Sequence, residues 1–124
     1  MSTKIILWLE NTALLVFSLL AYIHIQGPWW LFVALFLVPD LSMLGYLAGP
    51  RVGANAYNLV HTSALPLILI VIGVITAAQT AILIALIWLA HITWDRMLGY
   101  GLKLPTSFND THLGRIGRDA RAEN

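Results

Sequence analysis

Four long apolar runs constrain the fold of this chain more than any other feature of its sequence. They are residues 5–25, 29–48, 57–78 and 81–98. Each run has about 18–22 residues, enough for a helix to cross a hydrocarbon core of about 30 Å. Only 10% of the residues are charged, whereas soluble domains have about a quarter. We therefore predict an all-α membrane protein with four transmembrane helices.

Lysine and arginine predict the direction of each span. Lys4 precedes the first run, Arg51 lies in the second connection, and Lys103 follows the fourth run, but the first and third connections contain neither residue. The positive-inside rule then predicts an up-down-up-down bundle in a bacterial inner (plasma) membrane, with both termini cytoplasmic. We expect a loop at residues 49–53, a bundle over residues 1–104 and a polar cytoplasmic tail over residues 105–124.

Two further counts exclude whole classes of chemistry. The chain has no cysteine, so disulfides, thiolate metal sites and cysteine nucleophiles are excluded. Its net charge of +1 is too small to indicate nucleic-acid binding. The partner predicted from composition is membrane lipid.

Five ionisable residues interrupt the apolar runs. Each costs about 2.5–3.5 kcal/mol at the centre of a membrane helix, so such residues mark functional sites by default. In an antiparallel bundle all five fall at a similar depth on the cytoplasmic side. The five are Glu10, Asp40, His61, His91 and Asp95.

Their local spacing supports one shared pocket. His91 and Asp95 are four residues apart, so they share a helix face. Pro39 removes a backbone donor just before Asp40 and is expected to bend the second helix there. Irregular backbone at membrane depth is tolerated where it is buried in protein or lines a cavity.

Two histidines with carboxylates form a plausible shell for a divalent metal, namely zinc, iron or manganese. We predict Asp40, His61, His91 and Asp95 as ligands, and Glu10 as a further ligand or a catalytic general base. A metal there could lower the pKa of a water to near 7. The alternative is purely structural pairing, of His91 with Asp95 and of Asp40 with a nearby arginine.

A second set of residues is predicted to bind substrate near this pocket. Arg96, Lys103 and Arg115 would suit an anionic group such as phosphate. Residues 108–115 could fold back as a lid, or Asn109 or Asp110 could instead cap a short terminal helix. The predicted substrate-binding residues are Tyr57, Asn58, Arg96, Lys103 and His112.

Several motifs resemble known families. Pro39-Asp40-Leu41-Ser42, Tyr57-Asn58-Leu59-Val60-His61-Thr62, the stretch from His91 to Arg96, Gly99-Tyr100-Gly101-Leu102-Lys103 and Asp110-Thr111-His112-Leu113-Gly114 together resemble a bacterial membrane family of unassigned function, domain of unknown function 4260. That resemblance implies four spans and no activity.

A weaker resemblance is to membrane-bound metal-dependent hydrolases. They share the order Pro39-Asp40, His61-Thr62-Ser63 and His91-x-x-x-Asp95. This resemblance implies metal-ligand roles for the two aspartates and the two histidines of these motifs. The chain has Ala56-Tyr57-Asn58 where those hydrolases carry His-Arg-Gly.

Four functions follow as hypotheses. The leading one is a small membrane metalloprotein, a metal-dependent hydrolase acting on a lipid-like or amphiphilic substrate. The others are an ion or proton transporter or channel, a haem protein with His61 and His91 as axial ligands, and a non-catalytic membrane scaffold. Gly45 and Gly49, four residues apart, would permit close helix contact in a homo-oligomer.

Overall fold

The computed structural model describes residues 1–104 and 109–116. Within this part of the chain, four apolar helical segments are long enough to cross a membrane. They are Thr3–His24, Trp29–Ala48, Pro50–Ile75 and Gln79–Met97. The all-α architecture with four spans is therefore confirmed.

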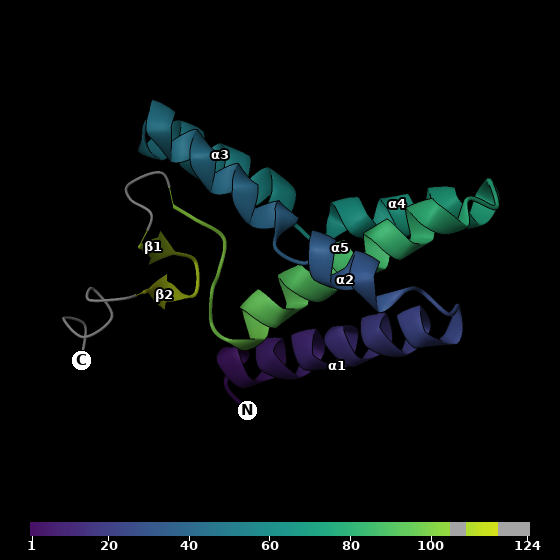
Figure 1. Ribbon diagram of the computed structural model, residues 1–124. Coiled ribbons are helices and arrows are strands. Elements are labelled where there is room, and N and C mark those ends of the chain that lie inside the picture. Colours follow the sequence, from purple (N-terminus) through teal and green to yellow (C-terminus); the bar gives the residue numbers. More distant parts are fainter. Residues whose placement is uncertain (105–108, 117–124) are drawn as a thin grey trace.

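The fourth span forms the centre of the molecule. This helix, α5 (Gln79–Met97), packs along α1 (Thr3–His24) and also contacts α4 (Ala64–Ile75) and α2 (Trp29–Leu35) (Figure 1). Half of the apolar window of α5 is buried, against 17% or less for each other span. A helix that is covered on several sides can carry functional side chains away from lipid.

The second and third spans are each broken in two, and a proline explains both breaks. Span two consists of α2 and the 3₁₀-helix η1 (Val38–Ala48), and span three of α3 (Pro50–His61) and α4. A proline ring clashes with the carbonyl of the residue four positions earlier. Those residues are Leu35 before Pro39 and Thr62 before Pro66, where α2 ends and where α3 gives way to α4.

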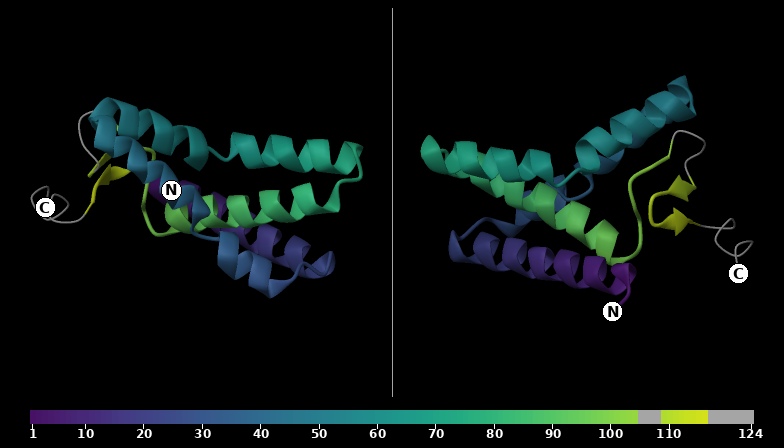
Figure 2. Two further views of the ribbon diagram at one scale, coloured as in Figure 1. Left: turned by 45° about the horizontal axis from the view of Figure 1, so that its top comes forward. Right: turned by 180° about the vertical axis from the view of Figure 1, so that it is seen from behind.

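η1 and α3 form a tight hairpin that diverges from α1 and α5 (Figures 1 and 2). The two elements are joined by Gly49 alone, whose φ of 117° favours glycine. The expected loop over residues 49–53 is therefore wrong, because Pro50 starts α3 in the first helical position that proline favours. Gly45 faces Ala56, so its close contact lies within the chain.

After α5 the chain turns at Gly99 and returns to α3. Residues 110–115 form a small antiparallel hairpin of β1 (Asp110–Thr111) and β2 (Gly114–Arg115), and Lys103 pairs with Thr111. The alternative of a helix capped by Asn109 or Asp110 is therefore wrong. The division into a bundle and a separate tail stays a prediction.

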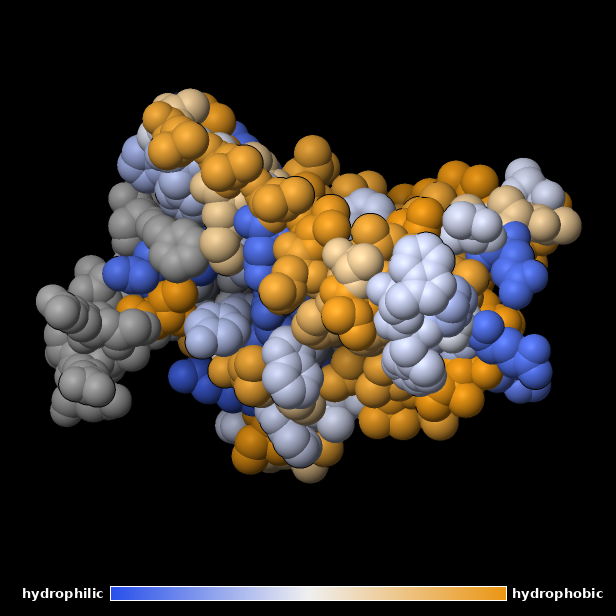
Figure 3. All heavy atoms as spheres, viewed as in Figure 1, coloured by the Kyte–Doolittle hydropathy of each residue, from blue (hydrophilic) through white to orange (hydrophobic). Residues whose placement is uncertain are grey.

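Apolar side chains cover much of the surface seen in Figure 3, and hydrophilic ones lie toward its two ends and in a band left of the centre. The exposed residues include Val33 at 76% and Ile75 at 78%. Such a surface fits a multi-pass membrane protein, in which lipid takes the place of a protein core. The up-down order across the bilayer and the cytoplasmic termini stay predictions.

Candidate metal centre

Four of the five ionisable residues in the apolar runs converge at the helix breaks. Asp40 lies on η1, His61 is the last residue of α3, and His91 and Asp95 extend from α5. One nitrogen or oxygen from each residue lies within 4.8 Å of all the others. Three segments that are distant in sequence thus supply one group of potential ligands.

The spacing of these atoms suits a single small cation. Asp40 Oδ1 lies 3.2 Å from His61 Nε2 and 3.0 Å from His91 Nε2, and the two nitrogens are 3.2 Å apart. Asp95 Oδ2 lies 3.6 and 3.3 Å from the same two nitrogens. Ligands about 2.0–2.1 Å from a tetrahedral zinc are about 3.3–3.4 Å apart. These five separations are close to that value, and all four atoms lie within 4.8 Å of one another.

The hydrogen bonding of His61 favours a cation further. Its Nδ1 lies 2.9 Å from the carbonyl oxygen of Tyr57, which can only accept, so Nδ1 carries the proton. In the neutral ring Nε2 then presents a lone pair to Asp40 and His91. A cation between these atoms would be coordinated by the lone pair of His61 Nε2, which otherwise faces other acceptor atoms.

His91 is held by packing on its other side. The ring of Phe36 meets it edge to face at 5.4 Å, and both histidine side chains are almost fully buried. His91 Nδ1 is buried with no hydrogen-bond partner among the described residues. This nitrogen lacks the carbonyl contact that orients His61.

The break after His61 exposes backbone carbonyls that α5 satisfies. A helix leaves its last four carbonyls without partners in the helix. Trp88 Nε1 donates to the carbonyl of Val60 at 2.7 Å, and Arg96 Nη2 donates to that of His61 at 2.8 Å. These bonds tie the end of α3 to α5 and fix the two histidines relative to each other.

The carboxylates face a polar cavity of about 380 Å³. The side chain of Asp40 is 32% exposed and that of Asp95 is 14% exposed, whereas His61 is fully buried. A cation here would be approached by water and substrate from the carboxylate side. The cavity is lined by Asp40, Met43, Tyr57, Asp95, Tyr100, Lys103, Asn109 and Ile116.

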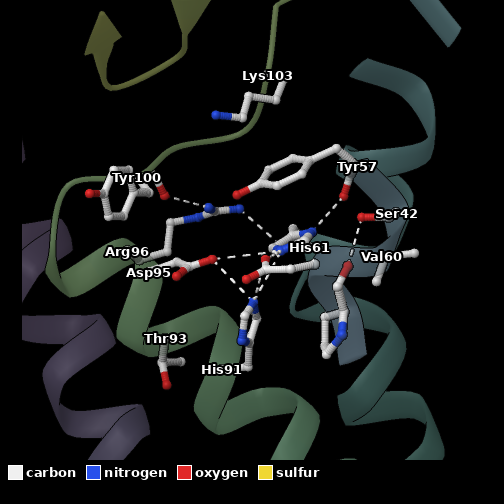
Figure 4. A network of polar contacts seen from close by, with 12 residues as sticks. Ser42, Tyr57, Val60, His61, His91, Thr93, Asp95, Arg96, Tyr100 and Lys103 are labelled. Carbon is white, nitrogen blue, oxygen red and sulfur yellow. Dashed lines mark hydrogen bonds and ion pairs between the residues drawn. The ribbon is translucent and has the colours of Figure 1, made fainter. Parts of the chain in front are cut away.

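Two of the predicted substrate-binding residues line this cavity. Figure 4 shows Tyr57 between Lys103 and His61. The Tyr57 ring stacks on His61 with centroids 3.7 Å apart, and Lys103 Nζ lies 4.9 Å from the Tyr57 centroid. Lys103 is buried, and this burial lowers its pKa. The Lys103 side chain places a cationic group in the lining of the polar cavity.

The side chains of the other three predicted substrate-binding residues form hydrogen bonds with backbone groups. The side-chain amide of Asn58 accepts from the Lys103 N–H at 2.5 Å and donates to its carbonyl at 2.7 Å. Arg96 donates to the carbonyls of His61 and Tyr100. His112 Nδ1 accepts from the Leu102 N–H at 2.7 Å. They position the segment that carries Lys103.

Glu10 is not brought into the group. Its side chain is exposed on α1, and the ligand group found among the described residues consists of the other four. Spacing along the helices predicted its depth but not the direction in which it points. Its role as a ligand or general base stays a prediction.

Part of the predicted lid borders the cavity. Asn109 and Ile116 line it, on either side of the β1–β2 hairpin. Phe108 and the side chains of Asp110 and Arg115 lie outside what the structure describes. The contact with the cavity therefore comes from residues at the two ends of the hairpin.

Sequence reasoning missed three residues that shape the site, namely Phe36, Pro66 and Trp88. Pro66 carried a readable signal, because a proline inside an apolar run indicates a break four residues earlier. Phe36 and Trp88 are ordinary in an apolar run. Only their contacts reveal their roles.

A family model described as "Domain of unknown function (DUF4260)" matches residues 4–116. This is the family that the motifs resemble. No curated protein and no solved structure matches the chain.

Proposed function

The chain belongs to this family of unknown function, so the family name assigns no activity. From the candidate site we propose that the protein is a small integral membrane metalloprotein that hydrolyses a lipid-like or amphiphilic substrate. The observation that carries this proposal is the group of two imidazole nitrogens and two carboxylate oxygens with the spacing of one coordination shell. The cavity on the carboxylate side gives the substrate access.

Each ligand has a distinct role in this proposal. His61 and His91 would hold a divalent zinc, iron or manganese ion through their buried imidazoles, and Asp40 and Asp95 would hold it through the carboxylates that face the cavity. Such an ion would supply a Lewis acid and bring the pKa of a water to near 7. Asp40 is the more exposed carboxylate, so it is placed to receive the proton of the attacking water.

The overall reaction would be an ordinary hydrolysis. The oxygen of water bonds to the acyl or phosphoryl centre, the bond to the leaving alcohol breaks, and the alcohol departs with a proton. Asp40 can accept the first proton and return it to the leaving oxygen. A contribution of Glu10 would require its exposed carboxylate on α1 to act on this site, which Glu10→Gln tests.

We also propose that the site opens toward the cytoplasm of a bacterial inner membrane. The N-terminus, the turn between η1 and α3, and the end of α5 lie on the left in Figure 1, and the other two helix connections lie on the right. Lys4, Arg51 and Lys103 belong to the left-hand set. The positive-inside rule supports placing that side in the cytoplasm.

Metal analysis tests the proposal directly. The full chain, purified without chelator, should contain about one divalent ion per protein, and His61→Ala or His91→Ala should lose it because each removes a ligand. His24→Ala is the matched control, since His24 is exposed at the far end of α1. Absence of metal from the wild type, or equal loss in His24→Ala, would overturn the proposal.

Transport is the second candidate, and the broken spans favour it. Discontinuous helices with a polar site at the break are typical of secondary transporters. Both breaks lie beside Asp40 and His61. Liposome proton or ion flux that Asp40→Asn abolishes would favour transport over hydrolysis. Haem ligation fits poorly, because the two Nε2 atoms, 3.2 Å apart, leave no room for a porphyrin between them.

A further inference from the structure

The side chain of Tyr57 ends in a hydroxyl that forms no hydrogen bond with any residue the structure describes. Tyr57 lines the polar cavity and is only 1% exposed. Tyr22, which is equally buried, donates its hydroxyl to the carbonyl of Pro28 at 2.6 Å, as buried hydroxyls ordinarily do. The Tyr57 hydroxyl is not one of the side-chain atoms that are fully enclosed without a partner, so it is accessible from the cavity. A ligand in the cavity can therefore reach it.

Packing fixes the direction of this hydroxyl. The Tyr57 ring lies nearly parallel to the His61 imidazole, with centroids 3.7 Å apart and an angle of 9° between the planes. Lys103 Nζ lies 4.9 Å from the centre of the same ring, and Figure 4 shows the ring between these two residues. A ring that is contacted in this way keeps its orientation, so the hydroxyl is in place before any ligand binds.

The hydroxyl end of Tyr57 lies near the candidate ligand atoms. In Figure 4 it points away from the backbone of α3, toward Arg96 and Asp95. Asp95 Oδ2 lies 3.6 Å from His61 Nε2, and Asp95 lines the same cavity as Tyr57. An ionised carboxylate can only accept hydrogen bonds, whereas a tyrosine hydroxyl can also donate one. Tyr57 therefore adds a donor to a wall in which Asp40 and Asp95 supply acceptors.

We propose that Tyr57 is a catalytic residue whose hydroxyl donates a hydrogen bond to the acyl or phosphoryl oxygen of the substrate, on which negative charge develops as water adds. A fixed donor at such an oxygen binds the transition state more strongly than the ground state. The proton stays on Tyr57 throughout, so the balance of the hydrolysis is unchanged. This inference rests on the proposed function and adds an oxyanion site to it.

Anion binding tests this role before the natural substrate is known. The full chain is purified in detergent and loaded with cobalt(II), whose visible absorption changes when an anion binds at the ion. Inorganic phosphate serves as the probe for a phosphoryl group, and acetohydroxamate as the probe for an acyl group. The wild type should bind at least one of the two. The probe whose binding depends on the Tyr57 hydroxyl identifies which group the site accepts.

Tyr57→Phe is the decisive variant, because it removes the hydroxyl and keeps the ring that stacks on His61. Its affinity for the identifying probe should fall by about tenfold, the effect of losing one hydrogen bond to a charged group. Tyr100→Phe is the matched control. Tyr100 lines the same cavity, but it is 40% exposed, and its backbone carbonyl is the group that accepts from Arg96. Its loss of a hydroxyl should leave the affinity and the metal content unchanged.

Metal content measured on the same samples separates a failure of this role from a failure of the proposed function. If the wild type and Tyr57→Phe hold the ion and bind both probes equally well, only the role of Tyr57 is overturned. The same holds if Tyr100→Phe loses as much affinity, if the loaded wild type binds neither probe, or if Tyr57→Phe loses the ion and so acts by positioning His61. A wild type that holds no divalent ion contradicts the proposed function and this role with it.

Discussion

At the scale of single residues, His61 shows how a local bond directs the chemistry of a site. The carbonyl of Tyr57 holds its Nδ1, and the Tyr57 ring stacks on the imidazole. Both contacts come from one turn earlier in α3, so the helix itself orients the ligand. The remaining nitrogen faces the other three polar groups of the candidate centre.

Protonation of His112 should break a specific hydrogen bond of the folded chain. Its Nδ1 accepts a hydrogen bond from Leu102, so the bond requires the neutral ring. Burial and the charge of Arg96 lower the pKa of His112 below its ordinary value of 6.5. A lowered folded pKa means that the stability from this bond is complete above pH 6.5 and is lost as the pH falls through the folded pKa.

We therefore expect the Leu102 amide to exchange its hydrogen faster, relative to its intrinsic rate, as the pH falls from about 7.5 through the folded pKa of His112. Hydrogen exchange followed by mass spectrometry measures this. His112→Gln should remove the pH dependence, because an amide can accept the bond without titrating. A constant ratio across this pH range in the wild type would contradict the assigned bond.

At the scale of elements, the η1–α3 hairpin determines where two of the four candidate ligands lie. Its helices approach closely because Gly53 leaves room for the ring of Tyr46. A Cβ at Gly53 would lie 2.3 Å from the nearest atom of that ring. The close packing of the hairpin thus depends on a glycine, which has no Cβ, at position 53.

Gly53→Ala should lower the thermal unfolding temperature, since overpacking of this kind costs about 1–3 kcal/mol. It should also weaken metal binding, because the hairpin carries Asp40 and His61. Thermal unfolding in detergent and metal analysis measure the two effects. Adding Tyr46→Ala should restore part of the stability by removing the ring, and a lack of rescue would show that the clash is not the cause.

At the scale of the whole molecule, the site lies where irregular backbone from two spans meets a continuous, buried helix. α5 carries two of the candidate ligands and donates hydrogen bonds to carbonyls at the broken end of α3. Broken helices at membrane depth need such a neighbour, because lipid offers no hydrogen bonds. The arrangement explains why α5 is the most buried span.

The predicted topology can be tested in a background that is already free of cysteine. Single cysteines in place of Ser2 and Arg51 should react only with reagents in the cytoplasm, and those in place of Gln26 and Gln79 only with reagents outside. The reason is the clustering of lysine and arginine on one side. Labelling of Ser2→Cys and Arg51→Cys from opposite sides would contradict the up-down-up-down order.

The sequence by itself determined the number of candidate spans and all four residues of the group that could hold a metal ion. Hydropathy measures which segments leave water, and ionisable residues inside those segments are rare enough to stand out. Asp40, His61, His91 and Asp95 were identified in this way, and Pro39 indicated one of the two breaks.

Only the tertiary structure decided which side chains face one another. Glu10 is, like the four candidate ligands, an ionisable residue inside an apolar run, yet its side chain is exposed on α1. Lys103 lies beyond the fourth apolar run, yet Asn58 holds its backbone against α3 and its side chain is buried. Depth follows from position along a helix, whereas direction depends on how the helix is rotated against its neighbours, and packing across the molecule sets that rotation.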